Sequence, residues 1–259
     1  MNINPDPILE FWNARAGLKA QAGSNDVIAK TLEIETLAAH LGDGLELAEF
    51  GCGNGISAVE FARRFDVRVT AFDFSPEMAR QAAEHAANVG VSERVCFAVA
   101  DIRDPPELMA RFDVVYCERM VINLPDWPSQ AAAICAMAGY LKPGGRLLMC
   151  ENSQPGLDNL NALRSAVGLE MIAPPWHNTY LDDTRVAALD IPGCRLLEVV
   201  PYSATYYFLS RVVNAWLAKR EGLQPAYDAP VNQLAALLPP FGDCAQGKLW
   251  IWQRDNKQG

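Results

Sequence analysis

The chain of 259 residues is 50% hydrophobic and carries a formal net charge of −9, from 31 acidic and 22 basic residues. This length and composition allow a sizeable buried core, whereas no apolar run approaches the roughly 18 residues of a membrane span. No cluster of lysine and arginine with interleaved aromatics indicates a nucleic-acid binder, and the seven cysteines are widely spaced without a C-x-x-C pair. We therefore expect a cytoplasmic protein that acts on a small molecule, without nucleic-acid or membrane partners.

Two helices are predicted ahead of the first strand. Phe11, Trp12 and Arg15 fall on one face of a short helix, and the polar run 23–26 then supplies a break and an N-cap. Apolar residues at helical spacing predict a second helix over 27–41. Trp12 and Arg15 have two interpretations: they contact a ligand, or they are a core anchor and a solvated charge.

The next feature is a short apolar run, 45–50, followed at once by Gly51, Gly53 and Gly55 and by a stretch of helical period. Strand, glycine turn and helix form the opening unit of a doubly wound sheet, in which ligands lie beyond the carboxyl ends of the strands. A dinucleotide fingerprint would place its third glycine at position 56, where this chain has Ile56. The spacing G-x-G-x-G therefore disfavours a nicotinamide oxidoreductase, which stays an alternative.

An acidic residue stands at the end of each of three predicted strands. Glu49 ends the first, Asp73 follows the strand 67–72, and Asp101 follows the strand 95–99. Asp73 lies 24 residues after Glu49, close to the offset at which an acid accepts hydrogen bonds from both ribose hydroxyls of a nucleotide. Asp101 is placed to accept from an adenine amino group. The simpler interpretation of Asp73 is that it caps its own turn.

The fourth and fifth strands are predicted over 112–117 and 146–150, and Glu118 directly follows the fourth. The helix 128–141 between them ends in a Lys-Pro-Gly-Gly run. Pro143 in this run halts the helix, and the two glycines allow a sharp reversal of the chain before the fifth strand.

The last hundred or so residues hold two further predicted strands, 194–202 and 248–253, of which the second is expected to be antiparallel. A long connection precedes each strand: one contains the proline- and aromatic-rich stretch 174–180, and the other begins with Tyr206. Insertions of this length in a compact domain are usually functional. We expect both to form a cap over an acceptor site rather than a separate domain.

These motifs resemble those of the class I S-adenosylmethionine (SAM) methyltransferases. Glu49 with the glycines matches motif I, Asp73 matches the acid after motif I, and Asp101 matches motif II. The run Leu-Lys-Pro-Gly-Gly-Arg-Leu-Leu matches the junction before strand five. The resemblance covers residues 24–153. The resemblance implies an α/β fold with a Rossmann-like, seven-stranded, mostly parallel sheet flanked by helices. It also implies a single domain, 1–259, with an N-terminal helical lid (1–43), a SAM-binding core (44–153) and a substrate cap with the last strands (154–259).

The cofactor that the resemblance implies is SAM, with S-adenosyl-L-homocysteine (SAH) as its product, and no metal is expected. SAM carries an amino-acid moiety that must lie flat against backbone, which glycines without a Cβ permit. The residues implied in cofactor binding are Trp12, Arg15, Glu49, Gly51, Cys52, Gly53, Gly55, Asp73, Phe74, Met78, Asp101, Ile102 and Glu118.

Methyl transfer from a sulfonium is an in-line displacement, so the protein mostly aligns donor and acceptor, and only a poorly ionised acceptor needs a base. His40 and His85 fall on predicted helix surfaces, whereas His177 lies in the proline- and aromatic-rich stretch. We hypothesise that His177 is the base, with a purely structural histidine as the alternative. Glu118 is the second catalytic candidate, because after strand four it can stabilise the positive charge of the donor or orient a hydroxyl group.

The residues implied in acceptor binding follow strands four and five or belong to the cap: Arg119, Asn123, Glu151, Asn152, Trp176, Tyr206, Tyr207 and Arg211. Arg211, one helical turn after Tyr207, can clamp an anionic group, while Arg119 can simply pair with Glu118. Glu118 together with Glu151 and Asn152 also superficially matches a Mg²⁺ site, which is the less favoured interpretation.

The sequence thus predicts a methyltransferase that acts on a small molecule, in the first instance on a hydroxyl group of a natural product, sugar or related metabolite. Amide-nitrogen and nucleic-acid acceptors are disfavoured, because the D/N-P-P-Y/F step of their enzymes is absent after strand four and Asp104-Pro105-Pro106 lies one unit too early. The alternatives are an N- or S-methyltransferase of a small metabolite and a non-catalytic SAM-binding regulatory or partner protein. A monomer and a homodimer both stay open.

Overall fold

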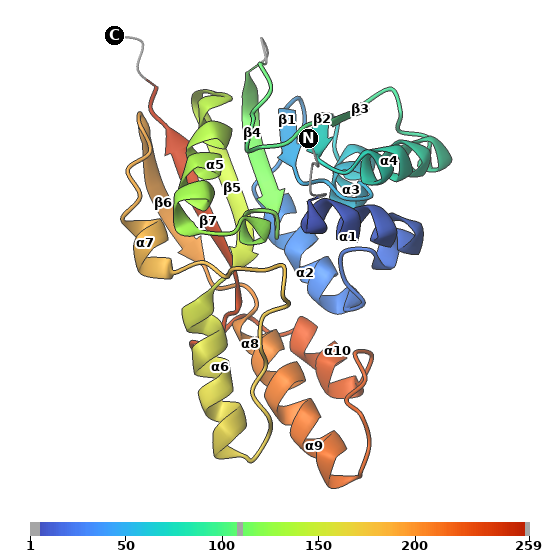
Figure 1. Ribbon diagram of the computed structural model, residues 1–259, viewed down its shortest axis with the longest axis vertical. Helices are drawn as coiled ribbons and strands as arrows, with labels where there is room; N and C mark the ends of the chain where they lie inside the picture. Colours follow the sequence, from blue (N-terminus) through green and yellow to red (C-terminus); the bar gives the residue numbers. More distant parts are fainter. Residues whose placement is uncertain (1–5, 108–110, 257–259) are drawn as a thin grey trace.

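The architecture is a seven-stranded sheet with helices on both faces, as seen in a computed structural model that describes residues 6–107 and 111–256 (Figure 1). The strand order is β3-β2-β1-β4-β5-β7-β6. The strands are β1 (Glu46–Phe50), β2 (Arg68–Asp73), β3 (Val95–Val99), β4 (Phe112–Glu118), β5 (Leu141–Asn152), β6 (Cys194–Val200) and β7 (Gly247–Arg254). β7 runs antiparallel to both of its neighbours, and the pairs among β1 to β5 are parallel. The predicted fold class and the antiparallel last strand are confirmed.

The helices fall into three groups along the chain. The first group precedes the sheet and comprises α1 (Pro7–Arg15), the 3₁₀ segment η1 (Ala16–Gln21) and α2 (Val27–Ala38). The second connects β1 to β5 and comprises α3 (Ile56–Arg64), α4 (Pro76–Val89), the 3₁₀ segment η2 (Val121–Asn123) and α5 (Trp127–Gly139). The third follows β5 and comprises α6 (Gln154–Ala166), α7 (Asp183–Ala187), α8 (Ala204–Tyr207), the π-helical η3 (Phe208–Asn214), α9 (Ala215–Arg220) and α10 (Pro230–Ala236).

Strands β4 and β5 illustrate why the sheet is covered on both faces. Val115 of β4 and Leu147 of β5 belong to one apolar cluster, which α5 covers through Met137. Val114 and Leu148 belong to a second cluster, to which α2, α3 and α4 contribute. Successive side chains of a strand point to opposite faces, so strands that are apolar throughout need helices on both sides.

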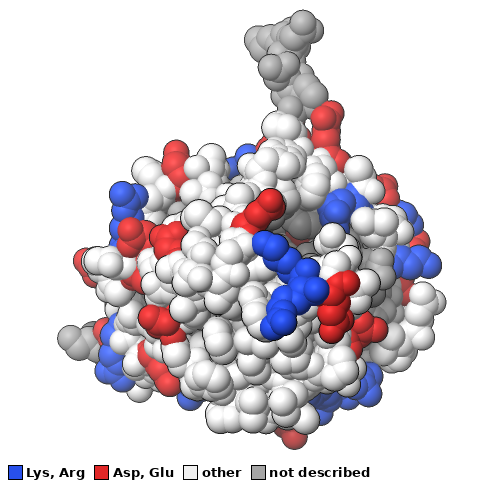
Figure 2. All heavy atoms as spheres, turned by 90° about the horizontal axis from the view of Figure 1, so that it is seen from below, with Lys and Arg blue, Asp and Glu red and all other residues white. Residues whose placement is uncertain are grey.

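A helical lobe, formed by α6, α8, η3, α9 and α10, lies beyond the carboxyl ends of β4 and β5 (Figure 1). Its core contains Leu160 of α6, Tyr206 of α8 and Val212 of η3, joined by Ala29 of α2. Figure 2 shows this end of the molecule, where uncharged residues cover most of the surface and charged side chains gather in small groups. In the described parts of the chain, no helix is both long and apolar enough to cross a membrane.

Two boundaries differ from the prediction at the junction of α5 and β5. The helix ends at Gly139, and the strand begins at Leu141 instead of Arg146. The Lys-Pro-Gly-Gly run therefore belongs to β5, where it forms an irregularity in the pairing with β4 rather than a sharp reversal. A Cβ on Gly145 would lie 3.0 Å from the carbonyl oxygens of Phe112 and Asp113 in β4, so glycine is needed there because two stretches of backbone approach closely.

Candidate active site

One cavity of about 520 Å³ opens at the carboxyl ends of β1, β2 and β4 and extends to the helical lobe. Its walls also include residues of α1, α2 and the connection between α6 and α7. All of the predicted site residues line this cavity except Gly55, Glu151, Trp176 and Tyr206. We call the part beside the glycine turn the cofactor end and the part beside the lobe the acceptor end.

Two glycines of the turn, Gly53 and Gly55, have different roles, which the sequence motif alone does not distinguish. Gly53 (φ +52) lines the cavity, and a Cβ placed on it would have no atom within 4 Å. Gly55 (φ +72) does not line the cavity, and its Cβ would lie 2.8 Å from the Phe97 ring and 2.9 Å from Ala82. Gly53 therefore leaves room for a ligand, whereas Gly55 allows α3 to pack closely against β3 and α4. The expected ligand contact of Gly55 is replaced by a packing role.

Asp73, at the end of β2, has its carboxylate against two backbone amides. Gly53 N–H donates to Oδ2 at 2.7 Å, and Ser75 N–H donates to Oδ1 at 2.9 Å. Burial raises the pKa of Asp73 to about 6, and the two amide bonds oppose that shift. Asp73 thus caps its own turn and also faces the cavity, where the remaining lone pairs of a carboxylate can accept further hydrogen bonds.

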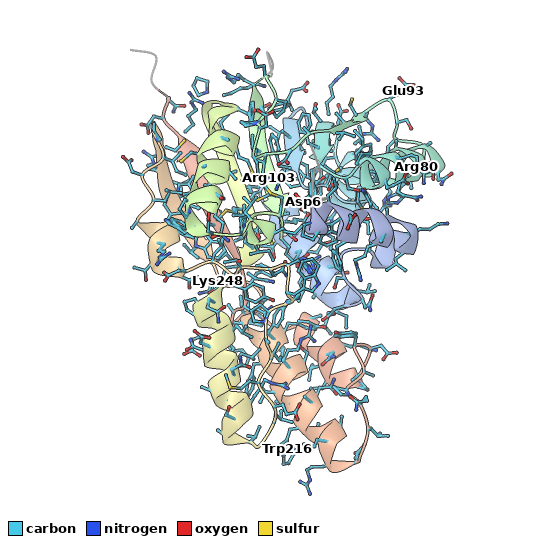
Figure 3. All side chains as sticks on the ribbon, viewed as in Figure 1. Asp6, Arg80, Glu93, Arg103, Trp216 and Lys248 are labelled. Carbon is cyan, nitrogen blue, oxygen red and sulfur yellow. The ribbon has the colours of Figure 1, made fainter. Side chains whose placement is uncertain are left out.

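Asp101, after β3, is paired with an arginine that the sequence analysis did not single out. Arg103 Nη2 lies 2.6 Å from Asp101 Oδ2 and 2.9 Å from Asp6 Oδ2, ahead of α1 (Figure 3). The Arg103 guanidinium also lies over the Phe74 ring, 5.9 Å from its centroid. These contacts tie the N-terminal segment to the strand ends that form the cofactor end.

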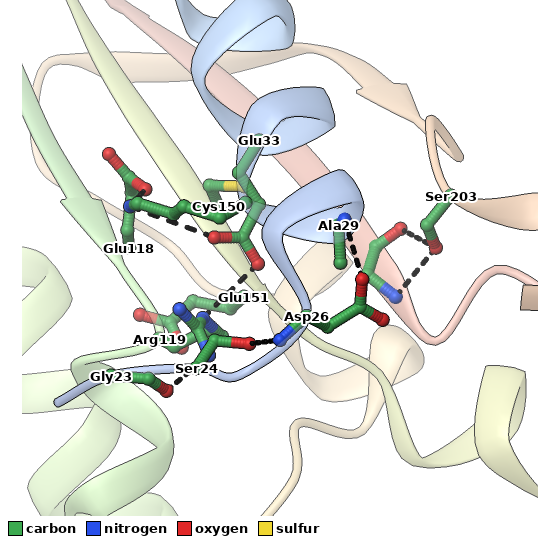
Figure 4. Close-up of polar contacts among 12 residues, drawn as sticks. Gly23, Ser24, Asp26, Ala29, Glu33, Glu118, Arg119, Cys150, Glu151 and Ser203 are labelled. Carbon is green, nitrogen blue, oxygen red and sulfur yellow. Dashed lines mark hydrogen bonds and ion pairs between the residues drawn. The ribbon is translucent and has the colours of Figure 1, made fainter. Parts of the chain in front are cut away.

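A buried charged cluster lies between the two ends of the cavity. Lys30 of α2 contacts Oε2 of Glu118, while Glu33 of the same helix lies 3.1 Å from Arg119 Nε through its Oε1 (Figure 4). The other oxygen of Glu118, Oε1, is buried without a hydrogen-bond partner among the described residues. Glu118 thus faces the cavity with one oxygen held by an ammonium and one available to a ligand.

Glu49 adds a third carboxylate to this cluster. Its Oε2 accepts a hydrogen bond from the Tyr116 hydroxyl at 3.1 Å, and the side chain is buried. Burial, and next the charge of Glu118, raise the pKa of Glu49 to about 8. Glu33, Glu49 and Glu118 face Lys30 and Arg119, so full ionisation leaves one acid in excess. A cationic ligand would compensate that charge.

Glu151 has a structural role, which corrects the expectation that it binds the acceptor. Its Oε1 accepts hydrogen bonds from the N–H groups of Met120 at 2.9 Å and Val121 at 2.8 Å, and its side chain is 1% exposed. It therefore neither lines the acceptor end nor joins Glu118 in a Mg²⁺ site. In the part of the chain that the structure describes, no group of three or more His, Cys, Asp or Glu is placed to hold a metal. Arg119, next to this turn, has φ +52, a strained conformation for a non-glycine residue.

His177 lies in an aromatic roof over the cavity, between α1 and the connection that follows α6. Its ring is 4.3 Å from the Phe11 ring and 5.6 Å from the Trp12 ring. Burial and the charge of Arg15 lower the pKa of His177, and its Nδ1 is buried without a partner in the described residues. The imidazole is thus neutral near pH 7 and can accept a proton.

Trp12 and Trp176, the other two predicted site residues of the roof, are placed differently. Trp12 Nε1 donates to Asn123 Oδ1 at 3.2 Å, which joins α1 to η2. Trp176 packs edge-on against Phe11 but is 66% exposed and lies outside the cavity. Trp176, which was expected to bind the acceptor, is therefore not among the residues that line the cavity.

The acceptor end is lined by residues of the lobe and of the strand ends. Arg211 of η3 pairs with Asp26, the N-cap of α2, at 2.6 Å, and Tyr207 lies beside it. Tyr206 points away from the cavity, because its hydroxyl donates to the other oxygen of Asp26 at 2.6 Å. Tyr206 thus positions Asp26 instead of contacting an acceptor. Further lining residues that the sequence analysis missed are Lys30, Ser57, Arg103, Asn178, Tyr180, Tyr227 and Gln246.

The cofactor end fits the group that the sequence predicts. Ser57 Oγ and Glu118 Oε1 are buried polar atoms without a partner among the described residues, and both residues line the cavity. Together with the open space over Gly53, they leave room for a ligand that brings its own polar groups. Of the four acids of the cavity wall, Asp101 is paired with Arg103 and Glu118 with Lys30, while Glu49 and Asp73 suit a ligand with a positive charge and hydroxyl groups.

Known proteins are similar to this chain in sequence and in fold. A family model described as a methyltransferase domain matches residues 47–145. Ubiquinone biosynthesis O-methyltransferase from Xanthomonas axonopodis pv. citri (strain 306) is 32% identical over 185 residues, which cover 69% of this chain and 71% of that protein. 27-O-demethylrifamycin SV methyltransferase from Amycolatopsis mediterranei (strain S699) is 36% identical over 107 residues, 41% of this chain and only 38% of that protein.

The fold is also similar to a solved structure along almost its whole length. The N-methyltransferase NodS from Bradyrhizobium japonicum WM9, in complex with SAH, aligns with a TM-score of 0.60 over 97% of this chain and 100% of that chain. The sequence identity is 14%, so this likeness concerns the fold alone.

Proposed function

The chain belongs to the SAM-dependent methyltransferases of class I, and we propose that it transfers a methyl group from SAM to a hydroxyl group of a small molecule. The observation that carries the proposal is the buried Oε1 of Glu118, which has no hydrogen-bond partner among the described residues and lies between the cofactor end and the acceptor end. The two relatives named above are O-methyltransferases of small molecules, which supports oxygen as the acceptor atom.

Bound SAM supplies a methyl group on a sulfonium, which needs no further activation. At the cofactor end, Asp73 is suited to accept hydrogen bonds from ribose hydroxyls and Asp101 from the adenine amino group. Gly53 allows the amino-acid moiety to approach the backbone, and Glu49 with Glu118 offers negative charge to a cation. The aromatic roof from α1 is proposed to cover the cofactor, and the helical lobe to cover the acceptor, as lid and cap of a single domain.

A hydroxyl acceptor must lose its proton during transfer. His177 suits this role, because its lowered pKa keeps it neutral and its Nδ1 has no partner in the described residues. Glu118 Oε1 is suited to accept a hydrogen bond from the acceptor hydroxyl and to orient its oxygen toward the methyl group. Asn152 and Arg119 line the same stretch of wall and are proposed to contact the acceptor.

The proposal is tested by incubating the protein with methyl-labelled SAM and a small-molecule extract of the source organism, followed by mass spectrometry. We expect an O-methylated product, and about a 100-fold lower turnover after Glu118→Gln and after His177→Ala, the scale of lost general acid–base assistance. Glu93→Gln and His85→Ala, which change residues outside the cavity, serve as matched controls.

Two outcomes would contradict parts of this proposal. SAM binding without any labelled product would favour a non-catalytic SAM-binding protein. A label on nitrogen or sulfur, with full turnover after both active-site substitutions, would show that no base is needed and that the assigned roles of His177 and Glu118 are wrong.

A further inference from the structure

The charged side chains of the cavity wall are spread unequally between its two ends. Four basic residues that line it, Arg15, Lys30, Arg103 and Arg119, precede position 124. All four carboxylates that line the cavity stand at the ends of β1 to β4, at Glu49, Asp73, Asp101 and Glu118. From position 124 onward, the described residues that line it include no acid, and the single Lys or Arg among them is Arg211. Beyond position 123, the described part of the wall therefore presents one charged side chain, the Arg211 guanidinium, at the acceptor end.

Arg211 is held rigidly with part of its hydrogen-bonding capacity still available. Its Nη2 donates to Asp26 Oδ2 at 2.6 Å, and its Nη1 lies 3.4 Å from Ser210 Oγ. The guanidinium carbon lies 5.1 Å from the centroid of the Tyr207 ring and 5.0 Å from that of the Tyr227 ring. A guanidinium has five N–H donors in a planar fork, so these two contacts leave donors for a ligand.

Asp26 pairs with Arg211 through one carboxylate oxygen only, because its other oxygen has partners of its own. Its Oδ1 accepts hydrogen bonds from Ala29 N–H at 3.0 Å and from the Tyr206 hydroxyl at 2.6 Å. Two further arginines lie nearby: Arg164 donates to the carbonyl oxygen of Arg211, and Arg119, which is paired with Glu33, lines the adjoining wall. Asp26 therefore positions the guanidinium through one of its N–H groups and leaves the others for a ligand.

We propose that the acceptor carries an anionic oxygen group, a carboxylate or a phosphate, which binds the Arg211 guanidinium while the body of the acceptor lies against Tyr207 and Tyr180. The inference rests on the proposed function, because it names the class of acceptor for the same cavity. The anion would be fixed at the lobe, and the methyl-accepting atom would lie toward Glu118. A purely structural Arg211, which only joins the lobe to α2, is the alternative.

The test compares ligands of similar shape and different charge on the protein saturated with SAH. Benzoate and phenyl phosphate are the anionic probes, benzamide is the neutral probe, and isothermal titration calorimetry gives the dissociation constants. We expect at least one anion to bind about 10-fold more tightly than benzamide, as a charge-assisted, geometrically matched contact predicts. Tighter binding of benzoate indicates a carboxylate acceptor, and tighter binding of phenyl phosphate a phosphorylated one.

Arg211→Met should abolish this preference, so that the anions bind no better than benzamide. Arg211→Lys should retain part of it, because lysine keeps the charge and loses the planar fork. Arg220→Met is the matched control, since Arg220 stacks on Trp216, which stands at the tip of the lobe in Figure 3, and does not line the cavity. The SAH affinity and the melting temperature of each variant show whether that variant is folded. If Arg211→Met does not fold, the comparison is made with Arg211→Lys instead.

Equal binding of the anions and benzamide, or an anion preference that survives both Arg211 substitutions, would overturn the inference. Such a result with intact SAH binding and methyl transfer would leave the proposed function standing. If the unmodified protein does not bind SAH, the proposed function itself is refuted.

Discussion

The cofactor end and the acceptor end of the cavity are assembled in different ways. At the cofactor end, each key residue follows a parallel strand within a few positions, so the sheet alone brings Gly53, Asp73 and Asp101 together. At the acceptor end, Arg211 depends on Asp26, which is 185 residues away in the sequence. The first arrangement follows from strand order, whereas the second depends on how the lobe packs against α2.

The largest expected effect comes from breaking the cluster where the two ends meet. Lys30→Met removes the ion pair of Glu118 and leaves a buried carboxylate uncompensated, which should lower the free energy of unfolding by about 3 kcal/mol. Urea denaturation measures the change, with Lys219→Met, on the exposed surface, as the control. An unchanged stability would mean that the Lys30–Glu118 contact contributes nothing to the fold.

A pair of glycine substitutions sharpens the comparison within the cofactor end. Gly55→Ala should cost about 2 kcal/mol of stability, because its Cβ would meet Phe97 and Ala82 and the position has φ +72. Gly53→Ala should cost less stability, but it should weaken SAM binding, because its Cβ would enter the space left for the ligand. Thermal melts and SAM titrations separate the two effects. Equal losses of SAM affinity in both variants would contradict the division of roles.

The smallest expected effect is the release of a proton when the cofactor binds. With its pKa raised to about 8, Glu49 is mostly protonated at pH 7 in the free protein, and a cation bound beside it should release about one proton. Titration of SAM in two buffers with different ionisation enthalpies measures this release. Glu49→Gln should release none; equal release from both proteins would assign the proton to another group.

The same shift has a consequence for the protein without ligand. A carboxyl group whose folded pKa is raised binds more protons in the folded than in the unfolded state between its ordinary value and about 8. The contribution of Glu49 to stability is therefore present at low pH and is lost as the pH rises through that window. In Glu49→Gln, this part of the pH dependence should be absent.

How far the sequence predicts the site depends on the distance between interacting residues. Gly53, Asp73 and Glu118 line the cavity as the sequence predicts, because each ends or closely follows a strand whose apolar pattern is evident. Lys30 and Arg103 were missed, because their importance lies in the acids that they meet after folding. For Glu33 a signal existed, since this charge lies on the apolar face of the helix predicted over 27–41.

Two of the unmet expectations have a common physical reason. Glu151 and Tyr206 lie next to residues of the cavity, but their polar groups turn to partners inside the protein: backbone amides for Glu151 and Asp26 for Tyr206. A sequence indicates that a polar residue stands near a strand end or in a cap. It does not indicate whether the side chain turns to a ligand or satisfies a buried group.

A crystal structure of the protein with bound SAH tests the central claim most directly, namely that Glu118 separates a donor from an acceptor in one cavity. We expect the ribose at Asp73, the adenine toward Asp101, and the sulfur beside Glu118, facing Tyr207 and Arg211. A ligand whose sulfur points away from the helical lobe, or one that binds outside this cavity, would contradict this claim.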